Sequence, residues 1–145
     1  MKTTGSRNMM RFNHLAGEIS AAYHTASRRL GLSDSVSQIL YTLCESGGSC
    51  QLTDICHMTG LSKQTVNSSI RGLEKDGTVR LEAIDAKSKK VVLTKQGDIF
   101  AEKTAGRLIK AENEILDSWS REEIRLYLEL TERFLNTFKE KTEEL

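Results

Sequence analysis

A face of hydrogen-bonding side chains lies along one predicted helix in the middle of the chain. This helix begins after Ser62, and Val66, Ile70 and Leu73 recur on its other face at helical spacing. The polar face has no carboxylate before Glu74. Amides and hydroxyls can bond base edges and cations can bind phosphates, so we expect this face to bind double-stranded DNA. Its candidate contact residues are Ser62, Lys63, Gln64, Thr65, Asn67, Ser68 and Arg71.

A basic hairpin is predicted directly after this helix. Gly77 ends the helix, because glycine readily adopts the left-handed conformation found at helix C-termini. Alternating residues 78–83 and the apolar residues 91–93 predict two strands, so residues 84–90 form the turn between them. Ammonium groups on such a turn bind phosphates or a narrow minor groove. The candidate contacts here are Asp85, Lys87, Ser88, Lys89 and Lys90.

Helices are predicted over most of the remaining chain, which contains no proline. We expect residues 1–8 to be unstructured. A first helix is expected to end at Gly31, and a second helix is expected to end at Gly47 and Gly48. A short third helix is expected at about residues 52–59. The few residues between it and the polar-faced helix are typical of the turn in a helix-turn-helix. After the hairpin we expect one long fifth helix and a sixth helix capped by Ser120.

The apolar stripes of the end helices require a partner. A core of residues 33–97 leaves the first, fifth and sixth helices with wide stripes, including Phe12, Ile19 and Phe138. Soluble monomers rarely expose apolar patches of that size, so we expect a homodimer. The predicted fold is mainly α with a small two- or three-stranded β wing. It is a winged helix-turn-helix core (residues 33–97) between N-terminal (1–32) and C-terminal (98–145) dimerisation helices.

The distribution of charge supports a polyanionic partner for the central segment. Residues 61–95 carry eight basic and four acidic side chains, whereas residues 111–145 carry five basic and ten acidic side chains. No apolar run approaches the length of a membrane span, and the N-terminus lacks the apolar segment of a signal peptide. Three cysteines are too few for a disulfide framework. These features predict a cytoplasmic protein without a membrane partner.

Two motifs resemble those of the MarR (multiple antibiotic resistance regulator) family of bacterial transcription factors. One is Leu-Ser-Lys-Gln-Thr-Val at residues 61–66, ending in Leu-Glu-Lys-Asp-Gly at 73–77; the other runs from Asp85 through Lys87, Val91, Leu93 and Thr94 to Gly97. The resemblance implies a ligand-responsive repressor that binds a pseudo-palindromic operator as a homodimer.

The resemblance also carries expectations about single residues. The family usually has an arginine where this chain has Lys87, and the wing aspartate, here Asp85, holds that side chain at the minor groove. Ser68 and Gly72 also depart from the usual pattern, which implies fewer base contacts or a changed target sequence. A small-molecule effector pocket between the dimerisation helices and the core is implied, with His14 and Tyr23 as candidate ligand-binding residues.

Other classes of function have weaker support in the sequence. The chain has no phosphate-binding glycine loop, no Gly-x-Ser-x-Gly and no His-Glu-x-x-His, which argues against an enzyme. Cys56 and His57 are adjacent and point apart on a helix, so no metal site and no cofactor are expected. Cys44 and Cys56 fall on core stripes, whereas Cys50 is expected to be exposed. A thiol-based sensor using Cys50, or a winged-helix protein-interaction module without DNA binding, are the alternatives.

Overall fold

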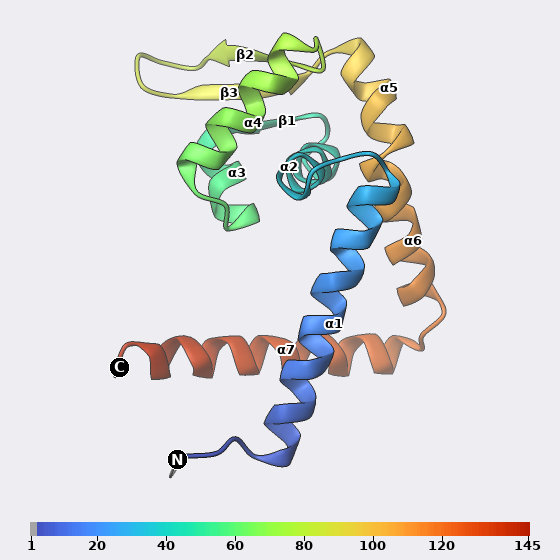
Figure 1. Cartoon of the computed structure of the whole chain (residues 1–145), viewed down its shortest axis with the longest axis vertical. Helices are drawn as coiled ribbons and strands as arrows, with labels where there is room; N and C mark the ends of the chain where they lie inside the picture. Colours follow the sequence, from blue (N-terminus) through green and yellow to red (C-terminus); the bar gives the residue numbers. More distant parts are fainter. Residues whose placement is uncertain (1–2) are drawn as a thin grey trace. The chain divides into compact units, whose positions relative to one another are not determined.

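The computed structural model describes residues 3–145 and divides into two compact units, the first ending at Leu108 and the second spanning Ile109–Leu145. Figure 1 shows the order of the helices and strands. They are α1 (Arg7–Arg29), α2 (Asp34–Glu45), β1 (Ser49–Gln51), α3 (Leu52–Thr59), α4 (Lys63–Lys75), β2 (Val79–Ala83), β3 (Lys89–Leu93), α5 (Lys95–Lys103), α6 (Ala105–Asp117) and α7 (Arg121–Thr142).

The core of the first unit joins α2, α3 and α4 to the sheet. Its largest fully buried side chains come from each of these elements: Ile39, Leu40 and Leu43 on α2, Ile55 on α3, Val66 on α4, Val79 on β2 and Val91 on β3. The predicted apolar face of α4 is confirmed, because Val66, Ile70 and Leu73 are all buried. Burial of this face turns the opposite, polar face of α4 toward solvent.

The wing is part of a three-stranded antiparallel sheet with the order β1-β3-β2. Residues Leu81 and Val91 are partners across β2 and β3, and Cys50 pairs with Val91 across β1 and β3. Strand β3 already begins at Lys89, so the turn is shorter than the expected 84–90, and Lys89 and Lys90 belong to the strand. The turn closes early because the Ile84 amide donates to the Ser88 carbonyl oxygen at 2.9 Å.

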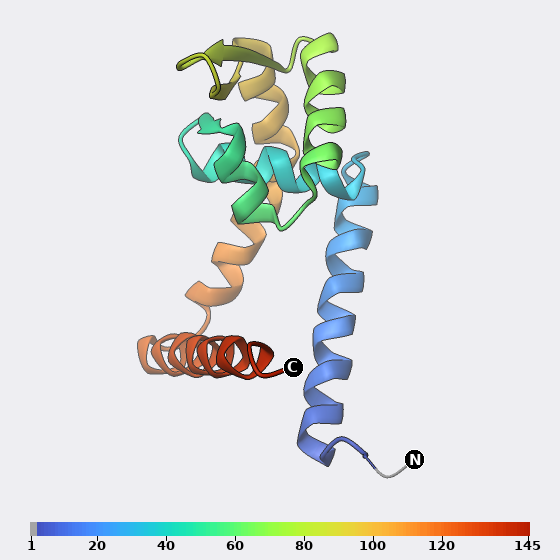
Figure 2. The same ribbon diagram turned by 90° about the vertical axis from the view of Figure 1, so that its left-hand side faces the viewer.

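Helix α1 extends away from the helix-turn-helix, as Figures 1 and 2 show. Its N-cap is Ser6, whose hydroxyl accepts from the Met9 amide at 3.1 Å, so the expectation of an unstructured segment through residue 8 is wrong at residues 7 and 8. Residues 1–2 lie outside the described part of the chain. Ser27 is the one buried residue of α1, which packs against α2 through its C-terminal end.

The expectation of one uninterrupted helix after the hairpin is wrong. Helix α5 ends at Lys103 and α6 begins at Ala105, with Thr104 between them at φ −120° and ψ −92°. The Thr104 amide bonds the Ala101 carbonyl oxygen, three residues back, instead of continuing the four-residue pattern of an α-helix. Neither proline nor a left-handed glycine causes this break.

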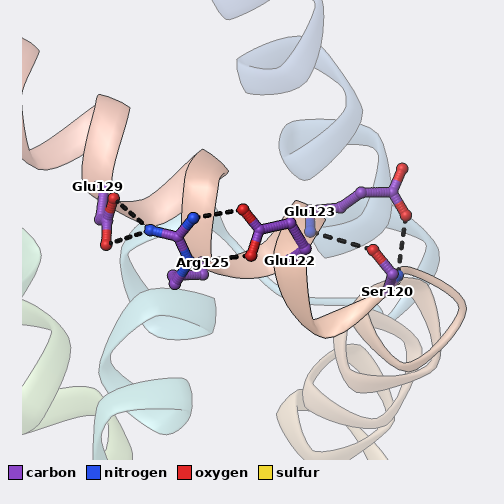
Figure 3. Close-up of polar contacts among 5 residues, drawn as sticks. All are labelled: Ser120, Glu122, Glu123, Arg125 and Glu129. Atoms are coloured by element: carbon purple, nitrogen blue, oxygen red, sulfur yellow. Dashed lines mark hydrogen bonds and ion pairs between the residues drawn. The ribbon is translucent and has the colours of Figure 1, made fainter.

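Helix α7 forms most of the second unit, and its predicted cap is confirmed. The Ser120 hydroxyl accepts from the Glu123 amide at 3.1 Å, and the Glu123 carboxylate accepts from the Ser120 amide at 2.9 Å, which is a capping box (Figure 3). One turn further, Arg125 bonds both Glu122 and Glu129 (Figure 3). No helix within residues 3–145 combines the length and the apolar character needed to cross a membrane.

Candidate nucleic-acid interface

The N-terminal end of α4 is held by its cap. The Ser62 hydroxyl accepts from the Thr65 amide at 3.1 Å and donates to the Thr65 hydroxyl at 2.9 Å. Lys63, Gln64 and Ser68 on the following turns are exposed, while Asn67 is half-buried. The cap therefore fixes the first turn, and Lys63, Gln64 and Ser68 are directed to solvent.

The C-terminal end of α4 is a glycine stop, as predicted. Gly77 has φ +76°, and the Thr78 amide donates to the Leu73 carbonyl oxygen at 2.9 Å, which closes the last turn. Gly72, one of the departures from the family pattern, has no atom within 4 Å of the position that a Cβ would take. Packing in this chain therefore does not require glycine at position 72.

Six of the twelve predicted DNA-binding residues line one hollow of about 400 Å3 between α4 and the wing. They are Lys63, Asn67 and Arg71 from α4, and Lys87, Ser88 and Lys89 from the wing. Ile70, Leu52 and Leu81 add apolar side chains to its lining, and Gln51 and Thr53 complete it. Four cationic side chains around one hollow form a surface that suits phosphate groups.

Sequence reasoning missed the contribution of Gln51, Leu52 and Thr53 to this hollow. They lie where β1 joins α3, and they reach the wing because β1 pairs with β3 in the register Gln51 to Lys90. A three-residue strand carries no periodic signal of its own, so the sequence offers no sign of this pairing.

The other six predicted residues lie outside the hollow. Ser62, Gln64, Thr65 and Ser68 occupy other positions at the start of α4, and Asp85 lies in the turn of the wing. Lys90 is half-buried on β3 and lines a separate hollow that includes Cys50, Asp54 and His57. The structure therefore groups Lys89 and Lys87 with α4, but it places Lys90 on a different surface.

Asp85 shapes the turn through the backbone. Its Oδ1 atom accepts hydrogen bonds from the amides of Lys87 and Ser88, both at 2.8 Å. These bonds stabilise the ionised carboxylate and lower the pKa of Asp85 below its ordinary value. Asp85 thus holds the Lys87 backbone directly and leaves the Lys87 side chain exposed. The expected interaction of Asp85 with the Lys87 side chain at the minor groove stays a prediction.

The cysteines differ from expectation. The expectation of an exposed Cys50 is wrong, since only 9% of it is accessible because β1 pairs with the central strand β3 and packs into the core. Cys44 and Cys56 are half-buried instead of buried. Burial raises the pKa of the Cys44 thiol, and the nearby carboxylates of Glu102 and Asp98 raise it further. Both effects disfavour the reactive thiolate at Cys44.

The two candidate ligand residues lie on the exposed part of α1. His14 is within 3.5 Å of Glu18 one turn along the helix, and Tyr23 is 45% exposed. Neither residue lines either of the hollows described above. Within residues 3–145, no group of three or more histidine, cysteine or acidic side chains is arranged to hold a metal ion.

The pairing of α3 with α4, followed by a basic antiparallel hairpin, defines a winged-helix protein. Residues 30–88 match the model of the MarR family. A search of curated protein sequences gave no match.

Solved structures with the same fold are distant in sequence. NMB1585, a MarR family regulator from Neisseria meningitidis, superposes with a TM-score of 0.80 at 18% identity over 97% of this chain and 100% of that one. AbsC, a MarR family transcriptional regulator from Streptomyces coelicolor, gives 0.72 at 20% identity over 96% and 98%. NadR in complex with 4-hydroxyphenylacetate gives 0.70 at 15% identity over 92% and 96%. The fold of a MarR-family transcription regulator is therefore shared along nearly the whole chain.

Proposed function

We propose that this protein is a sequence-specific DNA-binding repressor that acts as a homodimer on a pseudo-palindromic operator. The observation that carries the proposal is the hollow between α4 and the wing. There Lys63, Arg71, Lys87 and Lys89 surround the amide of Asn67 on a surface without a carboxylate in its lining. Helix α4 is then the recognition helix in the major groove, and the wing supplies contacts to phosphates or the minor groove.

The apolar faces of the end helices support a second copy as the partner. Ile19 on α1 is 53% exposed and Phe138 on α7 is 55% exposed. Helix α7 contains no buried residue, although Leu126, Leu128, Leu130 and Leu135 recur along it. A 22-residue helix with this pattern is stable when another helix packs on its apolar stripe, because intrinsic helix propensity alone contributes little to its stability. A two-fold dimer would also present two recognition helices to two half-sites.

A small-molecule effector fits the same proposal. The fold neighbour NadR was solved with 4-hydroxyphenylacetate bound, which shows that a protein of this fold can hold a small aromatic acid. We infer that an effector of this protein would act by changing the separation or orientation of the two recognition helices. His14 and Tyr23 remain candidates for contacts to it.

Selection from a pool of random DNA tests the proposal. The expected product is a motif of two inverted half-sites about one helical turn apart, bound by a species of twice the 16.3 kDa chain mass in light scattering. Lys139→Ala on α7 serves as the matched control for cation removal, since Lys139 is exposed and far along the chain from the wing. Recovery of no common motif, or binding by a stable monomer, would contradict the proposal.

A further inference from the structure

A second hollow, of about 480 Å3, lies beside α4 and shares no lining residue with the hollow next to the wing. Its walls come from the connection between α1 and α2, from the first turn of α2, from α4 and from α5. All of these elements belong to the first compact unit. Pockets of this volume hold small organic molecules. We call it the Thr78 hollow, after the buried threonine in its lining.

Small side chains on α4 leave this space open. Ser68 and Gly72 lie one turn apart on the same side of the helix, and both line the hollow. No atom lies within 4 Å of the position that a Cβ at Gly72 would take. Next to them, the Ser69 hydroxyl is hydrogen-bonded to the Ser35 hydroxyl of α2 at 3.0 Å. This bond joins the two helices beside the hollow, so the space lies between elements that are held together.

The Thr78 hydroxyl is a buried polar group without a partner. Thr78 is only 6% exposed, and its hydroxyl forms no hydrogen bond with any residue in the described range 3–145. No side-chain oxygen or nitrogen in that range is both fully enclosed and unbonded, so the hydroxyl keeps access to the hollow that Thr78 lines. Burial of an unbonded hydroxyl is unfavourable, and a ligand with a hydrogen-bonding group would relieve this cost.

Other buried hydroxyls of the first unit are bonded within their own helices. Each donates to the carbonyl oxygen one turn earlier, at 2.7 to 3.1 Å or within that range: Ser27 to Tyr23 at 3.1 Å, Thr42 to Gln38 at 2.9 Å and Thr104 to Phe100 at 2.8 Å. Thr78 follows Gly77, after the end of α4, and has no such carbonyl oxygen in reach of its hydroxyl among the described residues.

The charge of the Thr78 hollow is opposite to that of the hollow next to the wing. Asp76 is the one ionisable side chain in its lining, and it forms no ion pair with the residues that the structure describes. Asp76 is also the C-cap of α4, where the aligned peptide dipoles place partial negative charge. Both features favour a cation and disfavour an acid.

The remaining walls are apolar. Leu32 and Leu73 are buried side chains in the lining, and Val36 is half-buried. The ring of Phe100 is 38% exposed, so one aromatic surface is free to pack on a ligand or to lie against a cation. A ligand for this site therefore combines an apolar body with a positive charge.

We propose that the Thr78 hollow binds a small organic cation with an aromatic body. Its ammonium group donates to the Asp76 carboxylate and to the Thr78 hydroxyl, while the aromatic body packs against Leu32 and Phe100. Ser68 lines this hollow and is also a predicted DNA contact, so the cation and DNA compete for the same side of α4. This competition rests on the proposed function, whereas binding of the cation does not.

Equilibrium dialysis of the full-length protein tests the ligand class without DNA. The probes are naphthylethylamine, naphthylethanol and naphthylacetate, which share one aromatic body and differ in charge. The amine should bind most tightly and the acetate most weakly. Asp76→Asn should lower the affinity for the amine about fivefold and leave that for the alcohol unchanged. Glu74→Gln is the matched control, because Glu74 is exposed on α4 but does not line the hollow, and it should change neither affinity.

The opposite order of affinities, or equal losses in Asp76→Asn and Glu74→Gln, would overturn the assignment of a cation. Absence of amine binding at millimolar concentration would overturn the site itself.

Two further variants locate the bound amine. Gly72→Leu should fill the hollow and abolish binding, and Thr78→Val should weaken binding while keeping the shape of the side chain. Amide NMR shifts of the native protein on addition of the amine give a reading that does not depend on the folding of any variant. The shifts should change at Ser68, Gly72 and Gln96, which line the hollow. Changes confined to other residues would overturn the location.

A DNA-binding assay tests the competition. Naphthylethylamine should weaken binding of the native protein to its selected operator and should have no effect on Gly72→Leu. Amine binding with an unchanged operator affinity would overturn the shared use of Ser68. Failure of the native protein to bind any DNA would instead contradict the proposed function, while dialysis would still decide whether the hollow binds the cation.

Discussion

The Thr94 hydroxyl donates a 2.6 Å hydrogen bond to the carbonyl oxygen of Gly77, the residue that ends α4. The same hydroxyl is 3.2 Å from the Thr78 carbonyl oxygen and accepts from the Gly97 amide at 2.9 Å. One side chain thus joins the end of α4, the end of β3 and the first turn of α5. The base of the wing is fixed at the point where it leaves α4.

This junction depends on close backbone approach at Gly97. A Cβ there would lie 1.8 Å from the Thr78 carbonyl oxygen, which is backbone and cannot rotate away. We predict that Gly97→Ala lowers the free energy of unfolding by several kcal/mol, since it forces apart a buried junction. Thermal or denaturant unfolding measures the effect.

Gly72→Ala is the matched control for this substitution. No atom lies within 4 Å of the added methyl group, and alanine is favoured over glycine in a helix by about 1 kcal/mol. The variant should therefore unfold at the same or a higher temperature than the native protein. Equal losses of stability in both variants would show that the contact at Gly97 is not the cause.

The turn of the wing should weaken in acid. The amides of Lys87 and Ser88 hold the pKa of Asp85 below its ordinary value, so the contribution of these bonds is fully present above the unfolded pKa. It should disappear as the pH falls through the lower, folded pKa. NMR titration of the Asp85 carboxyl carbon against pH measures this pKa.

Asp85→Asn separates charge from geometry in the turn. An amide oxygen can still accept from both backbone amides, so the turn should keep its shape at neutral pH but lose its acid transition. A carboxyl group at position 85 that titrates at or above about 3.9 would contradict the role given to Asp85.

Peroxide should have little effect on DNA binding. Cys50 is 9% exposed, and burial together with two carboxylates raises the pKa of Cys44. Neither thiol combines access with a stabilised thiolate, which a sensor cysteine needs. Gel-shift assays before and after mild peroxide should give the same affinity. A loss of binding that Cys50→Ala prevents would make the protein a thiol sensor.

The sequence predicts well the elements whose signals are local. Ser62 and Ser120 cap their helices as expected, Gly77 ends α4, and the apolar spacing of Val66, Ile70 and Leu73 identifies the buried face. These signals depend on neighbours within one or two turns, so they are readable without the fold.

The features that the sequence does not predict depend on distant contacts. Strand β1 forms because Cys50 pairs with Val91, far along the chain, and this pairing buries a thiol that the sequence places in an exposed connection. Helix α5 ends before Thr104, although the sequence around that residue keeps helical spacing. The candidate site is predictable as a set of residues, but their grouping around one hollow requires the register of the sheet.

The wing should contribute affinity without sequence preference. Lys89 is an exposed cation beside the hollow, so Lys89→Ala should weaken binding to the selected operator and to random DNA by the same factor. The slope of log affinity against log salt should flatten by about one unit for each phosphate that the protein no longer neutralises. Lys139→Ala should change neither quantity. A changed sequence preference in Lys89→Ala would assign base reading to the wing.

The most direct test of α4 as the helix that reads DNA is the ratio of operator affinity to random-DNA affinity in Asn67→Ala. The Asn67 amide lies in the hollow on α4 and can pair with both hydrogen-bonding groups of an adenine edge, which is worth about 1–3 kcal/mol of discrimination. Fluorescence anisotropy across a salt series should show this affinity ratio falling in Asn67→Ala by the factor that corresponds to about 1–3 kcal/mol. The slope of log affinity against log salt should be unchanged. A ratio equal to that of the native protein, or a changed salt slope with the ratio intact, would contradict the assignment of α4.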